Sequence, residues 1–172
     1  MSGNMSVVDI LEASLIRGGA RWMADLNEFF RDYRIDETTF AIYAKGSTRN
    51  KGLLLSRFFA WTVLPDYLVS FFCVTEGNAL LTTDKIRSRI DSVNRISKNE
   101  ELKWAWLIIL SDRELPAQAV SFVSRYDRKE LGLAVASTSS RQVVLSNNQV
   151  GRSIGRQLNL RKALGSNKTW KS

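Results

Sequence analysis

Apolar residues at helical spacing dominate the first part of the chain. They recur about every four positions from Val7 and again from Trp22, which would place them on one face of a helix. Gly18 and Gly19 lie between the two stretches and would destabilise a continuous helix there. The pattern predicts helix over residues 7–33, kinked or broken at the two glycines.

Short segments rich in β-branched and aromatic residues follow, and such segments are typical of strands. We predict strands at 38–44, 58–64 and 67–75, the last two joined by a turn that contains proline. Both of these are almost wholly apolar, as strands covered on both faces tend to be. The basic loop 45–52 is not a Walker phosphate loop, because its lysine precedes the second glycine and no hydroxyl residue follows.

Helical and strand patterns alternate over the second half of the chain. In order, we predict a helix at 83–95 that Thr82 can cap, a strand at 103–110, a helix at 115–126, a hairpin of strands 131–136 and 142–145, and a basic helix at 151–164. Alternation of this kind implies crossover connections and parallel pairing. We therefore predict one α/β domain over residues 1–164, with a central mixed β-sheet flanked by helices on both faces. A polar tail follows over 165–172.

Composition agrees with a folded domain that does not cross a membrane. Hydrophobic residues make up 44% of the 172 residues and aromatic residues 10%, which is enough for a core. No run approaches the roughly 18 apolar residues of a membrane span. The first residues lack the basic and apolar regions of a signal peptide. We expect a cytoplasmic protein, nuclear if the source is eukaryotic.

The chain has one cysteine and no histidine, and this excludes several chemistries. Cys73 has no partner for a disulfide within the chain, and its apolar neighbours predict a core side chain. Without histidine there is no Ser-His-Asp triad, no Cys-His pair, no histidine general base and no zinc site of the Cys/His kind. Any metal would be held by carboxylates and backbone oxygens, which suit Mg²⁺ or Mn²⁺.

Positive charge is concentrated towards the C-terminal end. Residues 131–172 contain seven basic residues and no acidic ones, which gives +7 of the net +8. Residues 38–65 are also free of acids. A basic surface without acids binds phosphate backbones through counterion release and charge-assisted hydrogen bonds. The predicted nucleic-acid-binding residues are Lys45, Arg49, Lys51, Arg57, Arg141, Arg152, Arg156, Arg161 and Lys162.

The second half also carries a pattern that resembles the restriction-endonuclease-like, or PD-(D/E)xK, superfamily. In that fold a helix precedes a β-meander that holds the active site, and a helix, a strand, a helix and a strand follow. The resemblance covers about residues 9–145, and Pro65-Asp66 stands where the family has its metal-binding aspartate. It implies a nuclease-like scaffold whose last four elements are 83–95, 103–110, 115–126 and 131–136.

The catalytic motif of that superfamily is incomplete in this chain. Where the strand after the aspartate should end in Glu or Asp, any residue and Lys, the sequence is Glu76-Gly77-Asn78. Glu76 is then the second metal carboxylate, and Asn78 replaces the lysine that would activate water. Glu101-Leu102-Lys103 does spell the motif, but it precedes a later strand. With other strand assignments, Glu101 and Lys103 would be the pair, with Asp84 or Asp91 upstream.

These observations favour a nucleic-acid-binding protein on a nuclease-like scaffold, tolerant of sequence, without catalysis and without a cofactor. DNA and RNA are both open as ligands. One alternative is a Mg²⁺- or Mn²⁺-dependent nuclease with Asp66 and Glu76 as its catalytic and metal-binding residues. Another is a protein-interaction domain whose basic face meets an acidic protein or a second copy of the chain. A membrane ranks last because no apolar anchor accompanies the charge.

Overall fold

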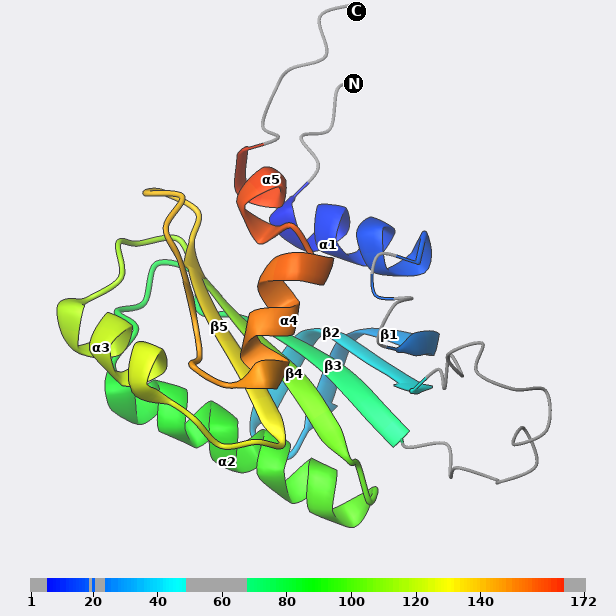
Figure 1. Ribbon diagram of the computed structural model, residues 1–172. Helices are drawn as coiled ribbons and strands as arrows, with labels where there is room; N and C mark the ends of the chain where they lie inside the picture. The colour runs from blue at the N-terminus through cyan, green and yellow to red at the C-terminus, as the bar shows by residue number, and fades with distance from the viewer. Residues whose placement is uncertain (1–5, 19, 21–23, 49–67, 166–172) are drawn as a thin grey trace, which may run out of the picture.

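The protein folds as three layers, a mixed β-sheet between two layers of helices (Figure 1). The computed structural model describes residues 6–18, 20, 24–48 and 68–165. Its helices are α1 (Val7–Ile16), α2 (Thr83–Asn99), α3 (Ala117–Arg125), α4 (Gln149–Gln157) and α5 (Leu160–Gly165). Its strands are β1 (Asp25–Ile35), β2 (Thr38–Ser47), β3 (Leu68–Thr75), β4 (Trp104–Ser111), β5 (Leu131–Ser137) and β6 (Val143–Leu145).

The six strands lie in the order of the sequence, β1-β2-β3-β4-β5-β6. The first three form an antiparallel meander, β3, β4 and β5 are parallel, and β6 returns antiparallel to β5 as the predicted hairpin. Each parallel connection crosses over through a helix, first α2 and then α3. The predicted mixed sheet with helices on both faces is confirmed.

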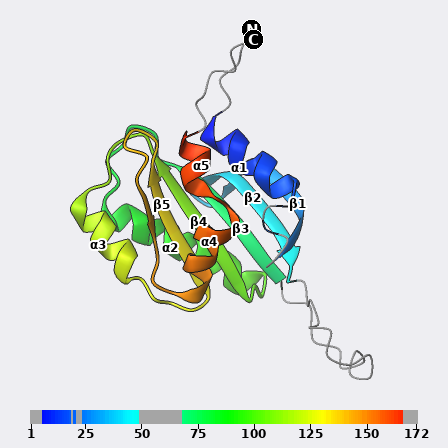
Figure 2. The same cartoon turned by 45° about the horizontal axis from the view of Figure 1, so that its top comes forward.

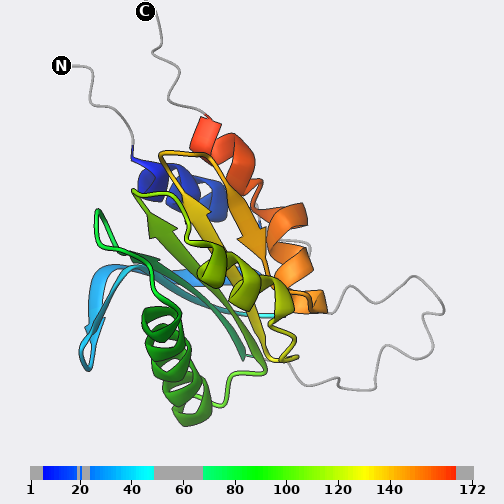
Figure 3. The same ribbon diagram turned by 90° about the vertical axis from the view of Figure 1, so that its left-hand side faces the viewer.

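Two apolar clusters, one on each face of the sheet, form the core. α1, α4 and α5 cover one face, and α1 packs beside α5 (Figure 2). α2 and α3 cover the other face, opposite α4 and α5 (Figure 3). Cys73 of β3 is fully buried, as predicted, and burial raises the pKa of its thiol to about 12. Its thiol therefore serves as a core side chain.

The segment after α1 corrects the first prediction. We expected helix to resume at residue 22 and to continue to residue 33, but residues 25–35 form β1, which pairs with β2. A β-bulge between Leu26 and Glu28 shifts the alternation of the strand by one residue. Leu26 and Phe29 therefore pack on one face of the sheet and Phe30 on the other. Apolar residues spaced in this way imitate the period of a helix.

The basic C-terminal helix is also different from the prediction. Instead of one helix over 151–164 there are two, α4 and α5, because Asn159 has a φ of 48° and interrupts the helical backbone. α5 includes Gly165, which we had assigned to the tail. The rest of the tail, 166–172, and the strand predicted at 58–64 lie outside the described residues.

The remaining elements agree with the sequence to within a few residues. Thr82 caps α2, with its side chain accepting a hydrogen bond from the Lys85 amide, and Pro116 is the N-cap residue of α3. The strands predicted at 38–44, 67–75, 103–110, 131–136 and 142–145 are β2 to β6. Within the described ranges, no helix has both the length and the apolar character needed to cross a membrane.

Candidate functional site

α4 lies directly against the sheet, and Trp106 of β4 holds it there. The Trp106 indole is 1% exposed, and its Nε1 donates to the carbonyl of Val150 at 3.2 Å and to Ser153 Oγ at 2.9 Å. Gly132 of β5 permits the close approach, since a Cβ there would lie 2.7 Å from the Val150 carbonyl carbon. The position of α4 is therefore set by the centre of the sheet.

Residue spacing on α4 and α5 separates an apolar face from a cationic one. The inner face is buried against the sheet and α1, and consists of Val150, Ile154, Leu158, Leu160, Ala163 and Leu164. Arg152 and Arg156 are four residues apart, so they lie one turn from each other on the outer side of α4. α5 adds two more exposed bases. We define the α4–α5 cation surface as Arg152, Arg156, Arg161 and Lys162.

The cations of this surface differ from five paired cations elsewhere in the described protein. Several other bases are paired with carboxylates: Arg31 with Asp9 and Glu12, Lys45 with Glu100, Arg87 with Asp84, Arg89 with Glu76, and Arg95 with Asp36. None of the four cations of the α4–α5 surface makes an ion pair with a carboxylate of the described residues. Within the described residues, no carboxylate competes with a ligand for their charge.

The other predicted nucleic-acid contacts are separate from this surface. Arg141 is exposed in the turn between β5 and β6 and has a φ of 56°. Lys45 of β2 lies on the α2 side of the sheet, where its Nζ is 2.9 Å from Glu100 Oε2. Arg49, Lys51 and Arg57 lie outside the described residues. Among the predicted contacts that the structure describes, the bases on neighbouring elements are those of α4 and α5.

Lys45 belongs to a small cluster that should respond to alkaline pH. Glu100 also accepts a hydrogen bond from the Tyr43 hydroxyl at 2.7 Å. Burial, and then the bond to Glu100, raise the pKa of Tyr43 to about 12. Burial lowers the pKa of Lys45, but hydrogen bonds to Glu100 and Tyr43 outweigh it and raise that pKa to about 12.

We expect this cluster to lose its stabilising effect between about pH 10 and pH 12. Both pKa values are raised above the ordinary 10.0 and 10.5, so the stabilisation is complete below pH 10 and is lost as pH rises towards 12. Tyr43→Phe should reduce the loss of unfolding free energy over that range by up to about 2 kcal/mol. Urea unfolding at several pH values measures this, and identical pH slopes for the two proteins would contradict it.

The candidate nuclease residues are not assembled into a metal site in the described part of the chain. Glu76 follows β3 with its side chain 7% exposed, and accepts a 2.8 Å hydrogen bond from Arg89 Nε. Arg89 also donates to Thr38 Oγ1 at 3.2 Å. No three Asp, Glu, Cys or His residues converge among the described residues. Asp66 lies outside them, so the metal-dependent alternative depends on a residue that the structure does not describe.

The second possible motif lies at the opposite end of the strands. The Lys103 amide donates to the Leu68 carbonyl, at the start of β3, whereas Glu76 follows the end of β3. Glu101 has a φ of 55° and precedes β4. This alternative required strand boundaries other than those predicted. β3 and β4 lie close to the predicted positions, so Glu101 and Lys103 lie outside the meander.

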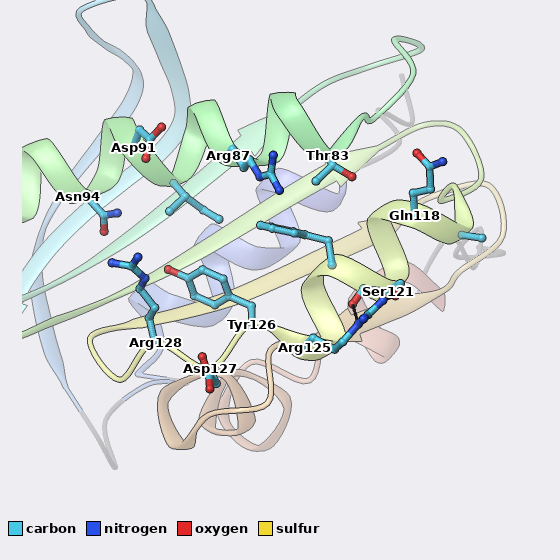
Figure 4. Close-up of a pocket in the computed structure, with 13 residues that line it drawn as sticks. Thr83, Arg87, Asp91, Asn94, Gln118, Ser121, Arg125, Tyr126, Asp127 and Arg128 are labelled. Carbon is cyan, nitrogen blue, oxygen red and sulfur yellow. Dashed lines mark hydrogen bonds between the residues drawn. The ribbon is translucent and has the colours of Figure 1, made fainter.

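A groove between α2 and α3 is a feature that the sequence pattern did not predict. It encloses about 950 Å³ and is lined by polar, charged and aromatic side chains from both helices (Figure 4). The sequence assigned the inner faces of both helices correctly. The residues on the outer faces of α2 and α3 did not indicate a binding site, because they come close together only where the two helices lie side by side.

Comparison of this chain with protein-family models, with curated proteins and with solved structures finds no significant match. The nuclease-like scaffold therefore stays a prediction.

Proposed function

We propose that this protein binds nucleic acid through the α4–α5 cation surface and does not cleave it. The observation that carries the proposal is the set of four exposed bases on two adjacent helices, unpaired with any described carboxylate. The closely spaced phosphates of a nucleic-acid backbone can contact several of these bases at once. Each contact releases counterions, and arginine can bind a phosphate through two parallel hydrogen bonds.

Binding of this kind is expected to tolerate many sequences. Contacts to phosphate fix the orientation of a protein on nucleic acid but carry no information about the bases. The exposed groups of the α4–α5 cation surface are cationic and include no aromatic residue. We therefore propose a general affinity for DNA or RNA.

Two further features support a non-catalytic protein on a nuclease-like scaffold. α1 precedes the meander of β1, β2 and β3, and α2, β4, α3 and β5 follow, which is the order that the resemblance implies. Glu76, the carboxylate nearest to the expected motif, is bound to Arg89. A carboxylate engaged in this way is poorly placed to hold a metal ion as well.

Replacing Arg152, Arg156 and Arg161 together with alanine should weaken the binding of a short oligonucleotide by about tenfold or more. Losing three phosphate contacts should also reduce the slope of log K against log salt by about 2 to 3. Fluorescence anisotropy with labelled DNA and RNA, between about 50 and 200 mM salt, measures both quantities.

The matched control removes three positive charges from the opposite side of the sheet. Lys85, Arg95 and Lys98 are all on α2, so their replacement with alanine changes the net charge equally. We expect this variant to keep the salt slope of the parent protein to within about one unit. Equal losses of oligonucleotide affinity in the two triple variants would show that binding depends only on net charge, and would contradict the proposed surface.

A further inference from the structure

The groove between α2 and α3 has the size and form of a small-molecule site. Its volume of about 950 Å³ lies within the range of ligand pockets. α2 and α3 both follow the carboxyl ends of parallel strands, so they begin at the same end of the groove (Figure 4). This gives the groove two chemically different ends.

The middle of the groove is aromatic. The rings of Phe122 and Tyr126 lie 6.2 Å apart and, with Ile90, form an apolar patch between the two helices. The guanidinium carbon of Arg87 lies 5.4 Å from the centre of the Phe122 ring. Because the guanidinium lies over the ring, a flat heterocycle that stacks on this face of Phe122 would displace it and keep it within reach. Stacking on an aromatic side chain is a common way to hold a nucleobase.

The end at which both helices begin suits an anion. Thr83 and Gln118, from the first turns of α2 and α3, lie there with Arg87 (Figure 4). Arg87 is 61% exposed, and its ion pair with Asp84 is long, at 3.7 Å. Pro116 supplies no side-chain cap to α3, so the positive end of that helix is not neutralised by its own cap residue. These groups favour a phosphate at this end.

The other end offers both donors and acceptors. Asp91 and Asn94 of α2 lie opposite Arg128, and the Tyr126 hydroxyl points towards this end (Figure 4). That hydroxyl is buried and has no hydrogen-bond partner among the described residues. A mixture of this kind matches the edge of a nucleobase, which also presents both donors and acceptors.

The charge of the groove limits how many phosphates it would accept. Three arginines line it, Arg87, Arg125 and Arg128, against two aspartates, Asp91 and Asp127, so the lining carries a net charge of +1. A single phosphate is well matched to this balance. A triphosphate would exceed the net positive charge of the lining.

We propose that the α2–α3 groove binds a nucleoside monophosphate. The base stacks on Phe122 with its edge towards Asp91 and Asn94, and the phosphate lies near Arg87. The groove is on the opposite side of the sheet from the α4–α5 cation surface, so this site is independent of the nucleic-acid binding proposed above.

Isothermal titration calorimetry of the full chain with AMP, GMP, CMP and UMP tests the proposal. At least one of them should bind saturably with one molecule per chain. Its parent nucleoside and inorganic phosphate, titrated separately, should each bind at least about tenfold more weakly, because each lacks half of the contacts. Absence of saturable binding by all four would overturn the proposal, as would equal binding of nucleoside and monophosphate.

Variants locate the site within the protein. Arg87→Gln and Phe122→Leu should each weaken monophosphate binding by about tenfold. Arg95→Gln, on the same helix but outside the groove lining, should bind as the parent protein does. Arg87 is exposed, so its variant remains informative if Phe122→Leu fails to fold. The groove assignment is overturned if Arg87→Gln binds normally.

The triple α4–α5 variant separates this proposal from the previous one. Replacing Arg152, Arg156 and Arg161 with alanine should leave monophosphate binding unchanged. A parallel loss of oligonucleotide and monophosphate binding would place both ligands on the α4–α5 surface, and would overturn the groove.

Discussion

Replacing Trp106 with alanine should lower the free energy of unfolding by about 3–5 kcal/mol. The indole is 1% exposed at the centre of the sheet, so its removal leaves a large cavity beneath α4. The substitution also removes the hydrogen bonds from Nε1 to the Val150 carbonyl and Ser153 Oγ, which hold α4 in place. Chemical denaturation followed by circular dichroism measures the change. Oligonucleotide affinity should fall in the same variant, because α4 carries Arg152 and Arg156.

Trp104 provides a matched comparison on the same strand. Its ring centre lies 5.1 Å from that of Trp106, but its side chain is only partly buried. Trp104→Ala should therefore cost less than Trp106→Ala. Trp106→Phe keeps a ring and loses the hydrogen-bond donor, so its loss of unfolding free energy should lie between those of Trp104→Ala and Trp106→Ala. If Trp106→Ala cost no more than Trp104→Ala, the anchoring of α4 described above would be wrong.

Replacing Glu76 with alanine should cost about 2–3 kcal/mol. The Glu76 side chain is 7% exposed and that of Arg89 is 24% exposed, so the substitution leaves a largely buried cation without its carboxylate. Partial exposure of Arg89 keeps the loss below that of a fully buried pair. A double-mutant cycle with Arg89→Ala isolates the interaction, and we expect a coupling energy of about 1–3 kcal/mol. Additive effects of the two substitutions would contradict a structural pair.

The same residue separates the proposed binding protein from the nuclease alternative. If Glu76 and Asp66 held a metal ion, Mn²⁺ would raise the melting temperature of the parent protein and not that of the Glu76→Ala variant. We expect no such difference. We also expect no cleavage of plasmid DNA with Mn²⁺ beyond that seen in EDTA. Cleavage that disappears in Asp66→Ala would establish the nuclease and overturn the non-catalytic proposal.

The sequence predicted the centre of the fold better than its edge. β3 and β4 are buried on both faces, so their continuous apolar runs had one simple interpretation. β1 is an edge strand with a bulge, and its apolar residues fall on both faces at nearly helical spacing. The break at Asn159 was missed for a different reason, because the basic and apolar pattern continues across it.

The candidate site was predicted only as far as it depends on neighbouring residues. The acid-free stretch 131–172 singled out Arg152, Arg156 and Arg161, and no carboxylate elsewhere in the described chain pairs with them. The partner of Lys45 could not be read in this way, because Glu100 is far along the chain and comes close only through the packing of α2 against β2. The same holds for Phe122 and Arg87, whose contact needs two helices side by side.

The central claim is that nucleic acid meets the protein on the outer side of α4 and α5. An amide NMR titration with a short oligonucleotide of mixed sequence, at low salt, maps that contact residue by residue. We predict that the largest shifts occur at the amides of Arg152, Arg156, Arg161 and Lys162 and of their neighbours, and that added salt reverses them. Shifts confined to α2 and α3, or no shifts at all, would contradict the claim.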